Sequence, residues 1–403
     1  MQSRLALIFV LLTVMIDSIG IGIIFPVMPQ LLESVTGADI SASALWGGVL
    51  GTAFAAMQFL FGPVIGNLSD RYGRRPVMLA ALAVMAFDYA VMAVAGTVWL
   101  LLIGRIVAGM AAATYSTANA YIADITAPED RARTFGYIGA AFGVGFILGP
   151  LMGGFAAELG ARAPFWLAAG IAAANLVFGW FVLPESLRAE NRRAFSLGRA
   201  NPFASFRAIG HLPGMRRYLV IMFLYTLAFQ SYGSVWSFFG TERFGWNAWW
   251  NGMSLAAFGL CMALVQSLGV APAIRAWGAK RTAAYGMAVD VGAFGFYGFV
   301  TSGFWALAFT PVGSAAGVAG PALQALMTNG TPEDQQGELQ GVVTSASSVA
   351  MGVAPMVMTT IFWVFTRPGA AIYAPGAPFL LASALMAICV VVLVADKRAA
   401  GAA

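Results

Sequence analysis

Twelve apolar stretches, each about as long as a helix that crosses a membrane, constrain this chain more than any other feature. A bilayer core about 30 Å thick is crossed by roughly 20 residues of helix. The chain is 60% apolar and only 10% charged, a balance that is foreign to a water-facing globular surface. We therefore expect an all-α polytopic membrane protein. The stretches cover residues 5–25, 43–66, 77–96, 98–122, 135–157, 164–183, 218–240, 250–273, 282–301, 304–327, 339–365 and 377–395.

The basic residues predict the orientation of the chain in the membrane. If the N-terminus is cytoplasmic, eighteen of the 22 Lys and Arg residues lie in cytoplasmic loops and tails. Only Arg162, Arg243 and Arg367 lie outside, and Arg105 falls within a stretch. Because cytoplasmic loops are enriched in Lys and Arg, both termini should be cytoplasmic. Nucleic acid is not an expected partner.

The two halves of the chain repeat one another across a polar linker. Residues 127–130 (APED) precede the fifth stretch, and residues 331–334 (TPED) precede the eleventh. Such repeats in secondary transporters place the binding site between the halves, near the bilayer midplane. We expect two pseudo-symmetric six-helix bundles, residues 1–183 and 218–403, joined by a cytoplasmic linker over residues 184–217.

The loop after the second stretch carries the clearest motif. Residues 66–76 read GNLSDRYGRRP and closely resemble the signature loop of the major facilitator superfamily. Glycines permit a tight turn, and the charges can pair at the cytoplasmic mouth. Charges that only fix topology are the alternative reading. The second half has Arg275 where the first has Asp70, so the gate should be asymmetric. The gate implied by the resemblance comprises Gly66, Asp70, Arg71, Gly73, Arg74 and Asp124.

Other blocks narrow the resemblance to one branch. The glycine-rich segment 139–154, with Pro150, resembles the motif of the drug and proton antiporters. Blocks at 17–29, 87–90, 104–109, 120–126 and 254–259 are similar to the tetracycline efflux pumps. The resemblance implies proton-coupled efflux (antiport) of small amphipathic drug-like compounds by alternating access, with tetracycline-like compounds among the candidates. A proton gradient would supply the energy, with no cofactor and no metal.

One position departs from those pumps. They carry a histidine in the eighth span, where this chain has Met262. The single histidine of the chain, His211, lies in the linker. The resemblance therefore leaves the substrate undecided.

Three acidic residues, Asp17, Asp88 and Asp290, lie well inside apolar stretches. A carboxylate at the bilayer centre costs about 2.5 to 3.5 kcal/mol on insertion scales, and such residues usually serve an ion or substrate path. Arg105 lies at a similar depth and should pair with one of the acids, Asp88 being favoured. Asp17 and Asp290 are then the stronger candidates for proton coupling. A static ion pair that only orders helices is the competing interpretation.

Aromatic residues in the seventh stretch predict part of a substrate cavity. Tyr225, Phe229, Tyr232 and Trp236 follow at steps of four, three and four, which puts them on one helical face. A flat amphipathic ligand suits this face, and a lipid-facing aromatic stripe is the alternative. The further cavity residues implied by the family resemblance are Gln58, Asn119, Tyr121, Gln230, Met262, Gln266 and Gln324.

Other functions have less support. The sequence lacks a Gly-x-x-x-x-Gly-Lys-Ser/Thr phosphate loop, which excludes a nucleotide-hydrolysing pump for this chain alone. We expect a secondary active transporter, not an enzyme, acting as a monomer with a small-molecule substrate, protons and the lipid bilayer as partners. The alternative is an exporter of an endogenous metabolite, lipid or organic anion, with Arg105 contacting the substrate. A receptor that no longer cycles is disfavoured by the intact loop around Asp70.

Overall fold

The computed structural model describes residues 2–112, 114–127, 130–196, 198, 200–203 and 214–395, and every regular element in these ranges is helical. The expected all-α class is confirmed. Pro128, Glu129 and His211 lie outside the described residues. The α-helices are α1 (Gln2–Thr36), α2 (Ile40–Tyr72), α3 (Arg74–Val94), α4 (Val98–Ala111), α5 (Thr114–Ile125), α6 (Arg131–Ala157), α7 (Ala163–Val182), α8 (Arg216–Phe229), α9 (Ser231–Phe244), α10 (Ala248–Leu264), α11 (Val270–Phe299), α12 (Gly303–Ala308), α13 (Thr310–Ser314), α14 (Ala319–Asn329), α15 (Gln336–Thr366) and α16 (Ala377–Val394).

Eleven helical segments in the described part of the chain are long and apolar enough to cross a membrane. One of them, Ala248–Phe299, has 52 residues. A helix of that length would extend about 78 Å, more than twice the thickness of a bilayer core. At Gly278 the backbone leaves the helical conformation with a φ of 77°, between the predicted stretches 250–273 and 282–301. This segment therefore covers two predicted spans, while the total of twelve stays a prediction.

Inside three of the predicted stretches the helix is interrupted. The stretch 98–122 is split at Ala112, the stretch 218–240 at Gln230, and the stretch 304–327 into four short helices. A proline in the first turn of α13 lacks the N–H that a continuous helix requires. Hydropathy averages the polarity of side chains over a window, so it does not reveal a break in the backbone inside an apolar run.

The helices group into two compact units by their contacts. These units follow the two halves of the sequence except for the first parts of α2 and α10. The predicted boundaries 1–183, 184–217 and 218–403 remain predictions. Unit 1 comprises Met1–Gly37, Ala53–Pro202 and Asn247–Ala256, and unit 2 comprises Ala38–Thr52, Phe203–Trp246 and Ala257–Ala403.

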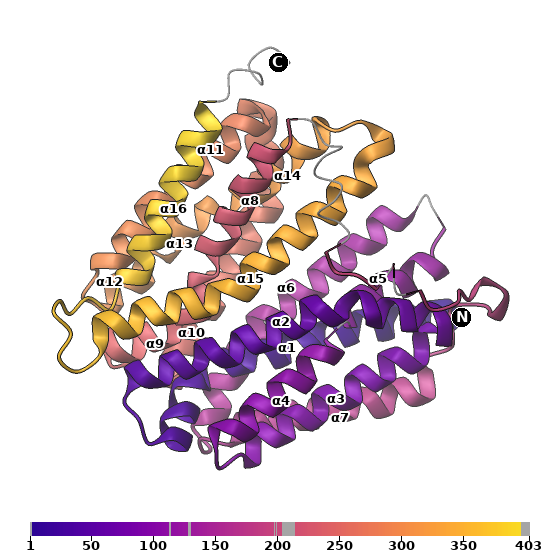
Figure 1. Cartoon of the computed structure of the whole chain (residues 1–403), viewed down its shortest axis with the longest axis horizontal. Coiled ribbons are helices and arrows are strands. Elements are labelled where there is room, and N and C mark those ends of the chain that lie inside the picture. Colours follow the sequence, from indigo (N-terminus) through magenta and orange to yellow (C-terminus); the bar gives the residue numbers. More distant parts are fainter. Residues whose placement is uncertain are drawn as a thin grey trace. The chain divides into compact units, whose positions relative to one another are not determined.

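Unit 1 is built on close packing of α1 with α6, next to α3 and α7, which run side by side (Figure 1). A Cβ atom added at Gly145 would collide with the carbonyl oxygen of Met15, and one at Gly149 would lie 2.7 Å from the Cα of Gly22. Small residues let helix backbones approach in this way. The helices that carry Asp17 and the glycine-rich motif are therefore in backbone contact.

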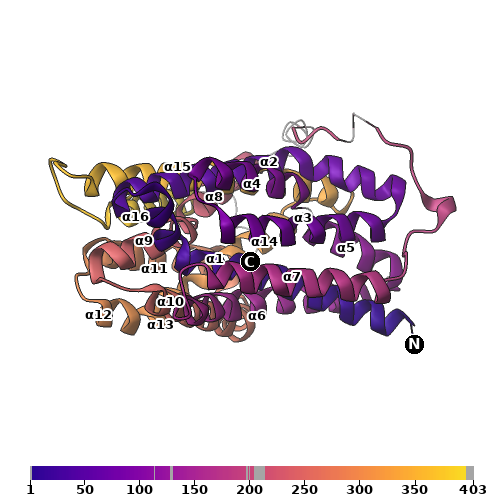
Figure 2. The ribbon, with the colours of Figure 1, turned by 90° about the horizontal axis from the view of Figure 1, so that it is seen from below.

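Unit 2 has an aromatic core. Its α11 lies along α16 and packs against α14, while α8 packs against α15 and α16 (Figure 1). The short helices α12 and α13 follow the end of α11 (Figure 2). The ring of Tyr232 is 5.1 Å from that of Phe294 and 6.0 Å from that of Tyr297, centroid to centroid. Rings at these separations contribute packing beyond their buried area.

Candidate functional site

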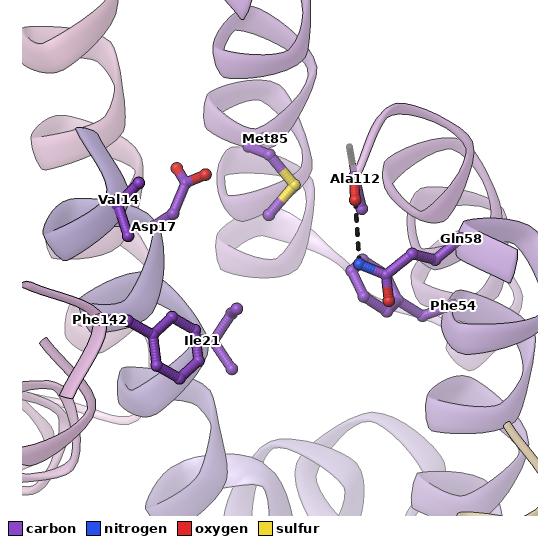
Figure 3. A pocket seen from close by; sticks show the side chains of 8 residues that line it. All are labelled: Val14, Asp17, Ile21, Phe54, Gln58, Met85, Ala112 and Phe142. Atoms are coloured by element: carbon purple, nitrogen blue, oxygen red, sulfur yellow. Dashed lines mark hydrogen bonds between the residues drawn. The ribbon is translucent and has the colours of Figure 1, made fainter. Parts of the chain in front are cut away.

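Asp17 lines a pocket inside unit 1. The residue is half-buried on α1. Figure 3 shows Val14, Asp17 and Ile21 on one side of the pocket, Phe54, Gln58 and Ala112 on the other, and Met85 between them. The remaining lining residue is Phe142 of α6. An acidic side chain and the Gln58 amide thus face a space whose other walls are apolar, an arrangement typical of sites for amphipathic or cationic groups.

Gln58 belongs to this pocket and binds the backbone at the break in the fourth predicted span. Its Nε2 donates a hydrogen bond of 2.9 Å to the carbonyl oxygen of Ala112, between α4 and α5 (Figure 3). A backbone carbonyl released from helical pairing needs such a partner within a membrane. Of the cavity residues implied by the family resemblance, Gln58 is the one that lines the same pocket as Asp17, on its opposite side (Figure 3).

Asp88 and Arg105 form a buried ion pair between α3 and α4. Their exposed fractions are 2% and 8%. Gly104 makes room for the pair, because an added Cβ atom there would lie 2.7 Å from the Asp88 Oδ1. The Arg105 guanidinium also lies over the Phe54 ring, 5.2 Å from its centroid. The structure thus contains the pairing of Arg105 with Asp88 that the sequence favoured. Asp17 lines the pocket.

Asp290 lies on α11 in unit 2 and is only 2% exposed. Its Oδ2 has no hydrogen-bond partner among the described residues. It lies within electrostatic range of Tyr225 on α8, Tyr232 on α9 and Cys389 on α16.

The predicted aromatic face forms a continuous row of rings. The centroids of Tyr225 and Phe229 are 6.1 Å apart, those of Phe229 and Tyr232 5.6 Å, and those of Tyr232 and Trp236 6.0 Å. Tyr232 and Trp236 are buried against α11 and α16. Tyr225 and Phe229 are half-buried. Tyr232 and Trp236 therefore pack inside unit 2 and do not form an exposed aromatic stripe.

The other cavity candidates are dispersed. Tyr121 is fully buried in the core of unit 1, and its hydroxyl donates to the carbonyl oxygen of Pro184 at 2.9 Å. Asn119 is half-buried on α5, and Gln230 is half-buried at the break between α8 and α9. These three do not line the Asp17 pocket.

Met262, Gln266 and Gln324 are candidates in unit 2. Met262 contacts Gly317, where an added Cβ atom would meet its sulfur. Gln266 is exposed in η4 (Val265–Gly269), a π-helical turn, and such turns occur frequently at functional sites. Gln324 donates to Gln340 at 3.1 Å. The cavity role of all three stays a prediction.

The residues of the expected gate meet at the start of α3. Arg74 Nη1 lies 2.6 Å from Asp70 Oδ1, and Arg74 Nε lies 3.2 Å from Asp124 Oδ2. Gly73 has a φ of 107°, a conformation that glycine adopts without strain. These groups form one charge network at the end of the loop, and its opening and closing stay a prediction.

Two members of the expected gate are outside this network. Arg71 lies over the ring of Tyr72, 5.1 Å from its centroid. An added Cβ atom at Gly66 would meet nothing within 4 Å among the described residues. Neither residue contacts the gate acids in the interactions described.

The sequence analysis missed two residues of this network. Ser186 Oγ donates a hydrogen bond of 3.0 Å to Asp124 Oδ2, and Glu185 accepts hydrogen bonds from the backbone at the start of α3. Both follow α7 in what the sequence presents as a polar linker. The available signal was their position next to a helix end in a segment with few other acids.

A model of the Major Facilitator Superfamily matches residues 10–355. The chain belongs to the Major Facilitator Superfamily. It is an integral membrane transporter protein with the fold of that superfamily, as expected from the signature loop. This Major Facilitator protein is 41% identical to tetracycline resistance protein, class C, of Escherichia coli over 90% of this chain and 91% of the relative. It is 34% identical to the class B protein of the same organism, over 90% and 88%.

Solved structures agree on the fold. The human organic anion transporter MFSD10 (TETRAN) superposes on this Major Facilitator chain with a TM-score of 0.69 and 27% identity, over 97% of this chain and 99% of that one. A bacterial homologue of the human lysosomal transporter Spinster gives a TM-score of 0.72 at 17% identity, over 98% and 95%. At that identity the second likeness shows the fold alone.

Proposed function

We propose that this protein exports small amphipathic drug-like compounds in exchange for protons, by alternating access. The carrying observation is the half-buried Asp17 in a pocket lined mainly by apolar side chains, while Asp88 is already neutralised by Arg105. The similarity to tetracycline resistance proteins over about nine-tenths of both chains supports the same function. Tetracycline-like compounds are among the candidate substrates.

The proton gradient is the proposed energy source, with no cofactor. Asp17 and Asp290 are the proposed proton-carrying groups. Carboxyl groups inside a membrane usually serve ion or substrate paths, proton relays among them. Substrate and proton would then compete for Asp17, which is the coupling that antiport requires.

The proposed substrates are neutral, zwitterionic or cationic. The alternative, export of an organic anion with Arg105 as the contact, takes some support from the similarity to the human organic anion transporter. The buried pairing of Arg105 with Asp88 disfavours it, because a buried arginine that already has its carboxylate gains little from another anion. Uptake of cationic and anionic dyes into inverted vesicles separates the two.

The proposed setting is a monomer in a bacterial cytoplasmic (inner) membrane, with both termini cytoplasmic. The distribution of basic residues supports this orientation.

The decisive experiment is transport into proteoliposomes under an imposed pH gradient. We expect Asp17→Asn and Asp290→Asn to abolish pH-driven accumulation of substrate. Downhill movement without a gradient should be retained in part, because only coupling is removed. If both variants concentrate substrate as well as the native chain does, the coupling proposal is wrong.

A further inference from the structure

A carboxylate outside the expected gate holds the backbone of the gate arginine. Glu185 follows the end of α7, and its Oε1 accepts a hydrogen bond of 2.8 Å from the backbone N–H of Arg74. Its Oε2 accepts from the backbone N–H of Arg75 at 3.3 Å. These are the first two residues of α3. Glu185 therefore caps a helix from a distant part of the sequence.

The local sequence explains why the cap comes from elsewhere. The first N–H groups of a helix lack partners within the helix, and the residue before it usually supplies a side-chain acceptor. Here that residue is Gly73, which has no side chain and a φ of 107°. A Cβ atom at Gly73 would collide with the Glu185 carboxylate. A negative charge at this position also interacts favourably with the helix dipole.

The rest of the segment after α7 also binds the last turns of α2. We call residues 184–196 the post-α7 segment; it runs past the end of unit 1 at which α3 begins (Figure 2). The N–H of Arg193 donates to the carbonyl oxygen of Asp70 at 3.1 Å. Asn67 Nδ2 donates to the carbonyl oxygen of Ser196 at 2.6 Å. The segment thus contacts the last turns of α2 as well as the start of α3.

At the corresponding turn of the second repeat, no side chain packs against the glycine in the part of the chain that the structure describes. Gly278 shares the positive φ, 77°, but an added Cβ atom there would meet nothing within 4 Å in the part of the chain that the structure describes. The capped loop is therefore the one that carries the gate acid Asp70.

We propose that Glu185 is a positioning residue of the cytoplasmic gate. By capping α3 it fixes the backbone of Arg74, so that the guanidinium meets Asp70 and Asp124 together. Because Ser186 also donates to Asp124, the post-α7 segment takes part in each opening and closing of the gate. This role rests on the proposed transport function, whereas the cap itself does not.

Hydrogen exchange on the purified full-length protein tests the cap. In Glu185→Ala, the amides at the start of α3 should exchange about fivefold faster than in the native chain, the usual effect of losing a helix cap. Glu185→Gln keeps one acceptor oxygen and should give an intermediate rate. The control is Glu190→Ala, which removes a carboxylate of the same segment that is 73% exposed. Unchanged exchange in Glu185→Ala, or an equal change in the control, overturns the proposal.

Transport kinetics in proteoliposomes test the role in the gate. Glu185→Ala should lower Vmax about threefold to tenfold with KM changed less than about twofold, because conformational cycling and not substrate binding is impaired. In an Arg74→Ala background the same substitution should have no further effect. An equal loss in both backgrounds overturns the proposal. If the native chain moves no substrate, the proposed function fails, and hydrogen exchange still decides the cap.

Discussion

At the scale of single residues, one buried ion pair determines which acid remains for transport. Asp88 and Arg105 are both nearly inaccessible, and Gly104 provides the space in which they meet. A buried charge is tolerated only when it is paired, so the pair neutralises two of the four ionised side chains expected in the membrane. Asp17 and Asp290 are left in different surroundings, a pocket in one unit and an aromatic core in the other.

Substituting Gly104 with alanine should destabilise the protein. The new Cβ atom would lie 2.7 Å from Asp88 Oδ1 and would force the pair apart. Overpacking of this kind costs about 1–3 kcal/mol. The measurement is the apparent melting temperature in detergent. Gly62→Ala is the matched control, since an added Cβ atom there meets nothing within 4 Å among the described residues; equal melting temperatures for the two variants would contradict the prediction.

Removing the charge of Arg105 alone should destabilise the fold more than removing the charges of both Arg105 and Asp88. Arg105→Gln leaves the Asp88 carboxylate buried without its cation, at a cost of about 3–5 kcal/mol. Adding Asp88→Asn removes that charge and should restore folding, measured as the yield of monodisperse protein. If the double variant still accumulates substrate when a pH gradient is imposed, the pair is structural. If it folds but does not accumulate substrate, the pair takes part in coupling.

At the scale of elements, the glycine face of α6 determines how closely α1 approaches. Gly145 and Gly149 stand where a side chain would strike the backbone of α1, while an added Cβ atom at Gly143 would meet nothing within 4 Å among the described residues. The motif that marks the antiporter branch thus has a packing role at the helix carrying Asp17. Its glycines are not equivalent, and only the contacts distinguish them.

Gly145→Ala should therefore impair transport, whereas Gly143→Ala should be tolerated. The first substitution pushes α1 and Asp17 away from α6, because its Cβ atom would overlap the carbonyl oxygen of Met15. The second adds a methyl group in open space and favours the helix slightly. Initial rates of substrate uptake at equal protein levels measure the difference. Equal rates for the two variants would show that the α1 and α6 contact does not govern activity.

At the scale of the whole molecule, the sequence repeat is matched by repeated contacts. Within unit 1, an added Cβ atom at Gly252 of α10 would collide with the carbonyl oxygen of Pro150. Within unit 2, one at Gly48 of α2 would lie 3.0 Å from the carbonyl oxygen of Pro355. Pro150 and Pro355 correspond in the repeat, because they are 205 residues apart (355 − 150) and the segments APED and TPED are 204 apart (331 − 127). Each unit therefore contains the same glycine-on-proline contact between two of its helices.

The topology of the chain provides a test of the predicted count of twelve spans. If the 52-residue segment Ala248–Phe299 crosses the membrane twice, the turn at Gly278 and the C-terminus are both cytoplasmic. A green fluorescent protein fused after residue 403 should then fluoresce, and alkaline phosphatase inserted at residue 369 should be active outside. Fluorescence lost at the C-terminus, with phosphatase active there, would mean an odd number of spans.

The sequence by itself determined the solvent, the class and the family. A run of apolar residues must lie in lipid whatever its neighbours are, and the loop around Asp70 is local in the chain, so both are visible without a structure. Only the tertiary structure decided that Arg105 meets Asp88, that Asp17 faces a pocket, that Trp236 is buried, and that Glu185 caps α3. These facts depend on which helix faces lie together, and residues far apart in the chain leave no periodic signal of their contact.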